Sequence, residues 1–188
     1  MIEQLIQAFL LIFIPMDVFG SISVFMVLTE KMEEHSRKRN IKVAILIAAG
    51  LLLVFLFGGI YLLKMFRIDL KDFMIAGGIV LMILGVKIVL NMGLREKRAE
   101  KYQSAIVPMA TPLITGPAVI TSIIICVQNF GYALSFISAA LNILIAWFVL
   151  SNTTFFFKVL GRQGADVLSK IFGLILVAMA VGFIRAGV

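Results

Sequence analysis

The chain has 188 residues, of which 62% are hydrophobic and only 14% are charged. Soluble domains carry about a quarter charged residues, so this composition excludes an ordinary soluble protein. The net charge of +7 comes from Lys and Arg that cluster between apolar stretches, as in the cytoplasmic loops of membrane proteins, so we expect no nucleic-acid partner.

Six apolar stretches follow one another, and each approaches the roughly 20 residues that a helix needs to cross a bilayer. They cover residues 5–28, 42–63, 72–91, 105–127, 132–156 and 170–187. Backbone groups in lipid must be bonded within the segment, and the alternation of a membrane barrel is absent, so these spans are expected to be helices. No basic segment precedes the first span, so we expect it to be retained rather than cleaved as a signal peptide. The sequence predicts an all-α, polytopic membrane protein in contact with the lipid bilayer.

The first span is interrupted near its middle by a polar, weakly helical segment that starts at Asp17. A charged side chain this deep in an apolar span costs at least about 2.5–3.5 kcal/mol, so Asp17 should face a cavity or a partner. The alternative is that Asp17 only caps the following half-helix, because Asp is a favoured N-cap and Pro15, Gly20, Ser21 and Ser23 indicate irregular backbone. The two interpretations are compatible, since a cap at a break can also line a site.

Small residues recur at helical spacing in the third and sixth spans. They include Gly77, Gly78 and Gly85 in the third span and Gly173 and Gly182 in the sixth. Small side chains let two helix backbones approach closely in a membrane, so we expect these residues to pack helices rather than bind a ligand. In the fifth span, Asn142 is expected to hydrogen-bond to a neighbouring helix.

The fourth span contains a sharper break, because Pro108, Pro112 and Pro117 fall within ten residues of one another. Proline in a helix interior removes a backbone donor and costs about 3 kcal/mol. The order Thr115-Gly116-Pro117 predicts a helix that restarts there, with Gly116 as its cap and Pro117 as its first residue. The amides of the new first turn would suit an anion such as a substrate carboxylate. The alternative is a proline kink that only shapes packing.

Reactive side chains are scarce. Cys126 is the sole cysteine and lies in the fourth span, whereas His35 is the sole histidine and lies in the first loop. One Cys and one His cannot form the usual zinc cluster, and a Ser–His dyad inside the membrane is excluded. No Gly-rich phosphate loop is present. We therefore expect no enzyme activity, no bound metal and no organic cofactor.

The two breaks occupy equivalent places in two copies of one unit, offset by about 94 residues. Gly78-Ile79-Val80-Leu81 is likewise matched by Gly173-Leu174-Ile175-Leu176. Each copy, 1–94 and 95–188, holds three spans, and an odd number of spans inserts the second copy upside down. Inverted repeats with paired broken helices are typical of secondary transporters whose site lies near the midplane.

Lys and Arg are unevenly divided between the loops. Twelve of them belong to the first, third and fifth loops, whereas four belong to the other loops and the C-terminal end. The positive-inside rule therefore predicts that the three basic loops are cytoplasmic and that both termini are outside.

These motifs resemble those of the MarC family of inner-membrane proteins, also called the neutral amino acid transporter family, and the resemblance spans essentially the whole chain. The family's fourth-span pattern, Pro-x-x-x-Pro-x-x-x-Gly-Pro, is matched by Pro108, Pro112, Gly116 and Pro117. Its third-span Ala-Gly-Gly is matched at residues 76–78. Its first-span pattern, Asp-Pro-x-Gly-Asn-x-Pro, is matched at Asp17 and Gly20, and the chain departs from it at Val18, Ser21 and Ser23.

The resemblance implies transport of small neutral amino acids, such as glycine or alanine, across the inner membrane. We expect a site formed by Asp17, Gly20, Ser21, Ser23, Thr111, Pro112, Thr115, Gly116, Pro117 and Ala118. A proton or a sodium ion is the expected co-substrate, because no nucleotide-binding element is present. Two alternatives stay open: a drug or metabolite exporter of the same fold, and a channel or non-transporting membrane subunit. Direction, coupling ion and oligomeric state, a homo-oligomer included, are also open.

Overall fold

A computed structural model describes residues 2–22, 33–90 and 115–188, and these residues form helices without any strand. The helices are α1 (Ile2–Met16), α3 (Glu34–Met65), α4 (Leu70–Val89), α7 (Pro117–Ser151) and α8 (Thr153–Gly187). In this part of the chain, five helical segments are long and apolar enough to cross a membrane. The expected all-α membrane protein is therefore confirmed at this level.

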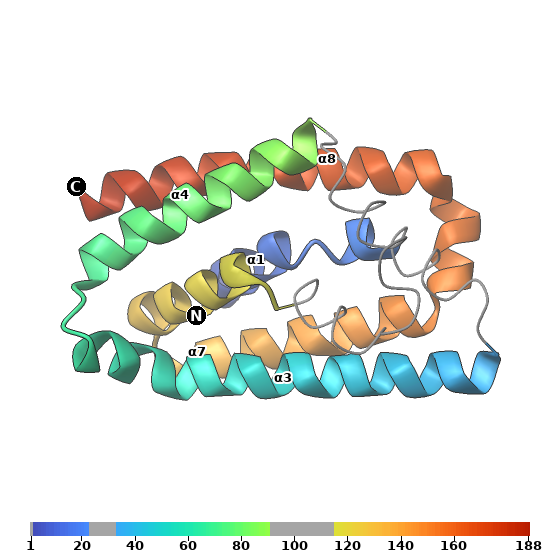
Figure 1. Cartoon of the computed structure of the whole chain (residues 1–188), viewed down its shortest axis with the longest axis horizontal. Coiled ribbons are helices and arrows are strands. Elements are labelled where there is room, and N and C mark those ends of the chain that lie inside the picture. The colour runs from blue at the N-terminus through green and yellow to red at the C-terminus, as the bar shows by residue number, and fades with distance from the viewer. Residues whose placement is uncertain (1, 23–32, 91–114) are drawn as a thin grey trace.

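The helices form a flat bundle in which α1 lies between two pairs (Figure 1). On one side α4 packs along α8, and on the other α3 packs along α7, while α1 contacts α7 and α8. Buried apolar side chains form two clusters. One joins α1, α3 and α7, and the other joins α1, α4, α7 and α8. Helices α1 and α7 therefore both contribute to the two clusters.

Helix α7 is a hairpin rather than one straight rod, because Gly131 adopts a φ of +76° between two helical limbs. The limbs run in opposite directions (Figure 1), and Ser135 Oγ donates to Cys126 Sγ at 3.3 Å across the hairpin. At 1.5 Å per residue the limb 117–130 is about 21 Å long, which is less than the roughly 30 Å of hydrocarbon. This limb is the described part of the expected fourth span, whose residues 105–114 lie outside the described ranges.

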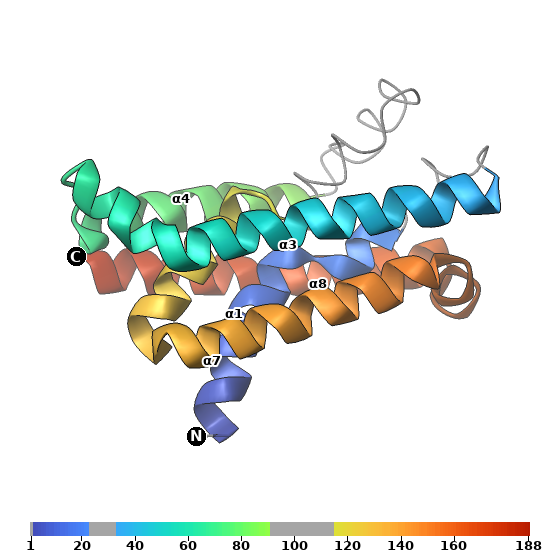
Figure 2. The same cartoon turned by 90° about the horizontal axis from the view of Figure 1, so that it is seen from below.

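Helix α8 also contains a turn, at Gly161, where φ is +65°. The limb 153–160 crosses the end of the bundle at a steep angle to the other helices and is seen end-on in Figure 2. The part long and apolar enough to cross a membrane is Gln163–Gly187. The first limb therefore caps the end of the bundle instead of extending through it.

The helix bounds differ from the expected spans mainly where charged residues continue a helix. Helix α3 begins at Glu34 instead of residue 42, and the crossing part of α8 begins at Gln163 instead of residue 170. Lys, Arg, Glu and Gln have good helix propensity, so a helix can extend beyond its apolar stretch into the interface. The six-span arrangement of two inverted repeats, 1–94 and 95–188, stays a prediction.

The expected role of small residues in packing is confirmed for Gly77, Gly78, Gly85 and Gly173. A Cβ at Gly77 would lie 2.1 Å from Thr121 Cγ2, and one at Gly78 would lie 2.8 Å from the carbonyl oxygen of Ala180. Gly182, in contrast, has open space around its Cα. The expected interhelical bond of Asn142 is also present, because Asn142 Nδ2 donates to the carbonyl of Phe9 in α1 at 3.2 Å.

Candidate functional site

The first membrane segment turns at Asp17. Helix α1 ends at Met16, Asp17 adopts a φ of +40°, and residues 18–22 are helical again. Few residues other than glycine adopt a positive φ, and Asp is among those that tolerate it best. Asp17 Oδ1 accepts the backbone N–H of Gly20 at 3.1 Å, three residues further on. This bond caps the short second segment, so the predicted cap at Asp17 is present; whether Asp17 also lines a site stays a prediction.

The same carboxylate has a second role, because its other oxygen reaches a different helix. Ser169 Oγ in α8 donates to Asp17 Oδ2 at 3.0 Å. The exposed fraction is 8% for Asp17 and 1% for Ser169. The Asp17 turn therefore joins the first membrane segment to the last through a buried polar contact.

Sequence reasoning did not identify Ser169, which lies just before the expected sixth span. The spacing of Ser169 relative to other small and apolar residues of α8 did indicate its buried position. Ala165, Ser169, Gly173, Leu176 and Ala180 form one buried stripe along α8, at intervals of three or four residues. Ser169 is the polar member of that stripe. Burial of a hydroxyl without a hydrogen-bond partner costs free energy, which favours a polar partner for Ser169.

Ser21 completes the turn. Its backbone N–H and its Oγ both donate to the carbonyl oxygen of Asp17, each at 3.0 Å. Ser21 is 3% exposed, and Gly20 is also buried. The structure therefore brings three of the expected site residues, Asp17, Gly20 and Ser21, into one turn. Ser23 lies outside the described residues.

The second expected break lies at the start of α7. Gly116 is the N-cap and Pro117 is the first residue of the helix, as the sequence predicts. The carbonyl of Gly116 accepts the N–H groups of Val119 at 3.0 Å and Ile120 at 3.1 Å. The N-cap residue makes no side-chain capping bond, because glycine has no side chain. In the first turn Ala118 is buried, at 3% exposed, whereas Gly116 is half-buried and Pro117 is exposed.

Thr115 connects this second turn to α3. Thr115 Oγ1 donates to the carbonyl oxygen of Ala48 at 3.3 Å, and Thr115 is 3% exposed. The hydroxyl therefore anchors the segment that precedes α7 and keeps lone pairs for a further donor. Thr111 and Pro112, the remaining expected site residues, lie outside the described residues.

Residues next to the two turns share the same buried clusters. Val18 and Val119 belong to the cluster that joins α1, α3 and α7. Ile14 and Ala118 belong to the cluster that joins α1, α4, α7 and α8. The turn at Asp17 and the start of α7 therefore both border the two buried clusters through which α1 packs against α7.

The two turns offer complementary chemistry. The Asp17 turn presents a carboxylate and the hydroxyls of Ser21 and Ser169, which suit a proton, a small cation or an ammonium group. The start of α7 presents the positive end of a helix dipole with no side-chain cap, which suits a carboxylate. Within the described ranges no group of three or more His, Cys, Asp or Glu residues could hold a metal ion.

Comparison with known proteins places the whole chain in one group. Residues 2–188 match the family model described as MarC family integral membrane protein. A UPF0056 membrane protein of Methanocaldococcus jannaschii is 30% identical, over 100% of this chain and 97% of its own length. The UPF0056 inner membrane protein YhgN of Escherichia coli is 28% identical, over 99% of this chain and 96% of its own length. No solved structure matches the chain significantly.

Proposed function

Since the chain belongs to the MarC family of integral membrane proteins, we propose that it is a secondary transporter of small neutral amino acids. The observation that carries the proposal is the buried carboxylate of Asp17, at a turn inside one membrane segment and bonded to Ser169 of another. Ionisable side chains at membrane depth are costly, and they typically mark a substrate or ion pathway.

The substrate in this proposal is an amino-acid zwitterion held between the two turns. Its carboxylate lies at the start of α7, against the N–H of Ala118, because Pro117 has no N–H and those of Val119 and Ile120 donate to the Gly116 carbonyl. Its ammonium group lies at the Asp17 turn. The absence of a side-chain cap on α7 supports the first contact, and the buried carboxylate and the hydroxyl of Ser21 support the second. Gly20, Gly116 and Ala118 carry little or no side chain, which favours a small substrate such as glycine or alanine. Ser23, Thr111 and Thr115 would supply further hydroxyls.

A proton or a sodium ion would drive the transport in this proposal. Asp17 is the proposed coupling group, because it connects α1 and α8 and its carboxylate can exchange Ser169 for a bound cation or a proton. An ion that changes this contact would shift the packing of the first membrane segment against the last. Such a link between ion binding and helix arrangement is what alternating access requires.

The proposed setting is the inner membrane, with both termini outside. The relative YhgN is named an inner membrane protein, which supports the location. The basic start of α3 and the α8 limb that carries Lys158 lie at one end of the bundle, and the C-terminus lies at the other (Figure 1). This separation supports a cytoplasmic basic end.

Equilibrium binding of radiolabelled glycine to the purified protein would test the function. Other amino acids and larger drug-like amines serve as competitors, at several sodium concentrations and pH values. We expect saturable glycine binding, competition by alanine and dependence on sodium or pH. Absence of saturable binding by any small neutral amino acid would contradict the proposal, and competition by drug-like amines alone would favour an exporter.

A further inference from the structure

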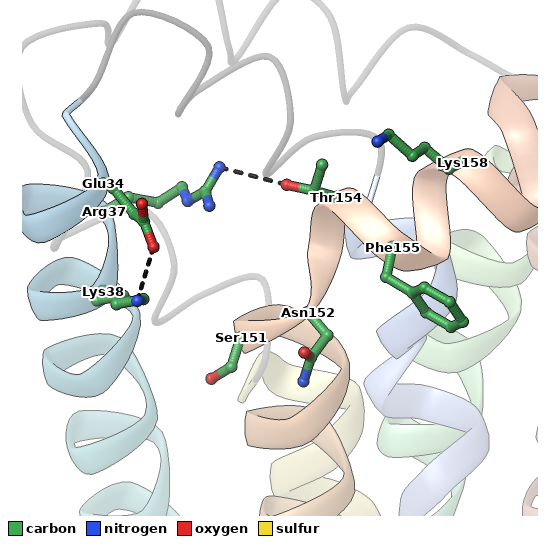
Figure 3. A pocket seen from close by; sticks show the side chains of 8 residues that line it. All are labelled: Glu34, Arg37, Lys38, Ser151, Asn152, Thr154, Phe155 and Lys158. Atoms are coloured by element: carbon green, nitrogen blue, oxygen red, sulfur yellow. Dashed lines mark hydrogen bonds and ion pairs between the residues drawn. The ribbon is translucent and has the colours of Figure 1, made fainter.

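The end of the bundle carries a pocket that is separate from both turns. It lies between the first turns of α3 and the junction of α7 with α8, and its volume is about 420 Å³ (Figure 3). The residues that matter for its chemistry are Glu34, Arg37 and Lys38 of α3 and Thr154, Phe155 and Lys158 of α8. Side chains from two distant parts of the chain therefore line one open pocket.

The pocket has an excess of positive charge. Glu34 and Lys38 form an ion pair at 2.7 Å, so their charges offset each other. Arg37 Nη1 donates to Thr154 Oγ1 at 3.3 Å, which uses one of the five guanidinium N–H donors. Lys158 extends from the next turn of α8 toward α3 (Figure 3). The lining thus holds three cations and one carboxylate, on which Arg37 also acts electrostatically, so an excess of two positive charges remains for an anion.

The start of α8 adds to this positive potential. Its N-cap is Asn152, whose side chain makes no capping bond and instead donates from Nδ2 to the carbonyl of Phe148 at 2.8 Å. The helix begins at Thr153, beside the Arg37–Thr154 contact. An uncapped helix start next to two cationic side chains suits a phosphate group, which accepts several charge-assisted bonds.

The α8 limb beside the pocket also carries exposed apolar side chains, of which Phe155 lines the pocket and Val159 does not. Phe155 and Val159 lie on the limb that crosses the bundle end, and their exposed fractions are 62% and 67%. Lys158, also exposed, lies between them in the sequence. A short segment with exposed apolar and basic groups, lying across the end of a membrane bundle, is suited to the headgroup boundary of the bilayer. A soluble anion would need the cations but not this apolar edge.

We propose that this pocket binds the phosphate of an anionic phospholipid. Arg37 and Lys158 hold the phosphate at the start of α8, and the glycerol and first acyl carbons lie along Phe155. Basic pockets between membrane helices on the cytoplasmic side recognise such headgroups. An anionic lipid is preferred over a zwitterionic one, because the two cations do not favour the positive charge of a headgroup amine. This inference does not depend on the proposed transport activity.

Titration of the delipidated, full-length protein with phosphatidylglycerol, followed by native mass spectrometry, would test the inference. Phosphatidylcholine is the zwitterionic comparison, and glycerol 3-phosphate is the soluble one. We expect phosphatidylglycerol to bind at least tenfold more tightly than either. Arg37→Gln and Lys158→Gln should each weaken that binding about five- to tenfold.

Arg39→Gln is the matched control, because Arg39 is an exposed cation two residues from Arg37 and does not line the pocket. It should leave the affinity unchanged. An equal loss in Arg39→Gln, or equal binding of phosphatidylcholine, would overturn the proposal. Glycerol 3-phosphate binding as tightly as phosphatidylglycerol would assign the pocket to a soluble phosphate and also overturn it. Lys158→Gln changes an exposed side chain, so it tests the pocket even where Arg37→Gln impairs folding.

Discussion

Gly85 of α4 and Gly173 of α8 bring the backbones of their helices into direct contact. A Cβ added to Gly85 would lie 2.8 Å from the carbonyl oxygen of Gly173, and one added to Gly173 would lie 3.1 Å from that of Gly85. The contact is thus reciprocal, because the backbone carbonyl of each glycine occupies the position that a side chain on the other glycine would need. Without a hydrophobic driving force between helices in lipid, such close approach supplies much of the packing energy.

Gly85→Ala should therefore destabilise the protein. The new methyl group would overlap Val177 Cγ2 at 2.7 Å as well as the Gly173 carbonyl. Overpacking of this kind costs about 1–3 kcal/mol, more than the gain of up to about 1 kcal/mol in helix propensity. Thermal unfolding in one detergent should show a lower midpoint. Gly182→Ala in α8, where nothing lies within 4 Å, is the control and should keep or raise the midpoint. Equal midpoints for the two variants would be inconsistent with tight packing at Gly85.

The bond between Ser169 and Asp17 should depend on the charge of the carboxylate. Hydrogen bonds to ionised groups contribute about 1.5–3 kcal/mol and neutral ones about 0.5–1.5 kcal/mol. Ser169→Ala should therefore cost more free energy of unfolding in the wild type than in Asp17→Asn, which retains the capping oxygen. Ser122→Ala is the control, because Ser122 Oγ is buried without a partner among the described residues. A double-mutant cycle measures the difference, and additive effects would show that the two side chains are not coupled.

Asp17→Asn should also distinguish the structural role of Asp17 as a cap from its proposed role in transport. The amide can still accept the N–H of Gly20, so we expect the variant to insert and fold. Uptake of glycine should fall, or its dependence on pH should change, because the proposed coupling group no longer titrates. Uptake by reconstituted vesicles at several pH values is the measurement. Wild-type uptake at every pH would leave Asp17 with the capping role alone.

Gly116→Val should abolish glycine binding while the protein stays assembled. A branched side chain at the N-cap of α7 would occupy the space in front of the first-turn amides, where the substrate carboxylate is proposed to lie. Gly58→Val in α3 is the matched control, since nothing lies within 4 Å of a Cβ there. Glycinamide, which lacks the carboxylate, should bind roughly ten- to a hundredfold more weakly than glycine. Equal affinities for glycine and glycinamide would falsify the carboxylate pocket.

The proposed topology predicts which end of the bundle is accessible from outside. In a Cys126→Ser background, Val188→Cys should react with a membrane-impermeant maleimide applied to intact cells. Arg39→Cys should react only after permeabilisation. Val188 is 89% exposed and Arg39 is exposed, so burial would not limit either reaction. The opposite labelling pattern would place the basic start of α3 outside and the C-terminus in the cytoplasm.

Local chemistry made parts of the site predictable from the sequence. The cap at Asp17 and the start of α7 at Gly116 and Pro117 depend on residues within three positions of each other, and both were expected. The glycines of α4 were also identifiable, because small residues at helical spacing have one common use in membranes.

Contacts between distant segments were not predictable in the same way. The bonds from Ser169 to Asp17 and from Thr115 to Ala48 join residues 152 and 67 positions apart. Their formation depends on how helices rotate and cross, which a pattern along one helix does not specify. The same applies to the limb 153–160, which the sequence placed partly in the fifth span and partly in a loop.

The bond between Asp17 and Ser169 also constrains the order in which the protein can be completed during synthesis. Asp17 enters the membrane with the first segment, whereas Ser169 is made 152 residues later. At about 5–20 residues per second, the ribosome needs about 8 to 30 s to reach it. During that time the carboxyl group has its local cap but not its partner in α8. The N-terminal segment therefore forms its bond to Ser169 only after the C-terminal segment has been inserted. In a truncated chain that ends before α8, the carboxylate would lack this partner, and cellular quality control could recognise it.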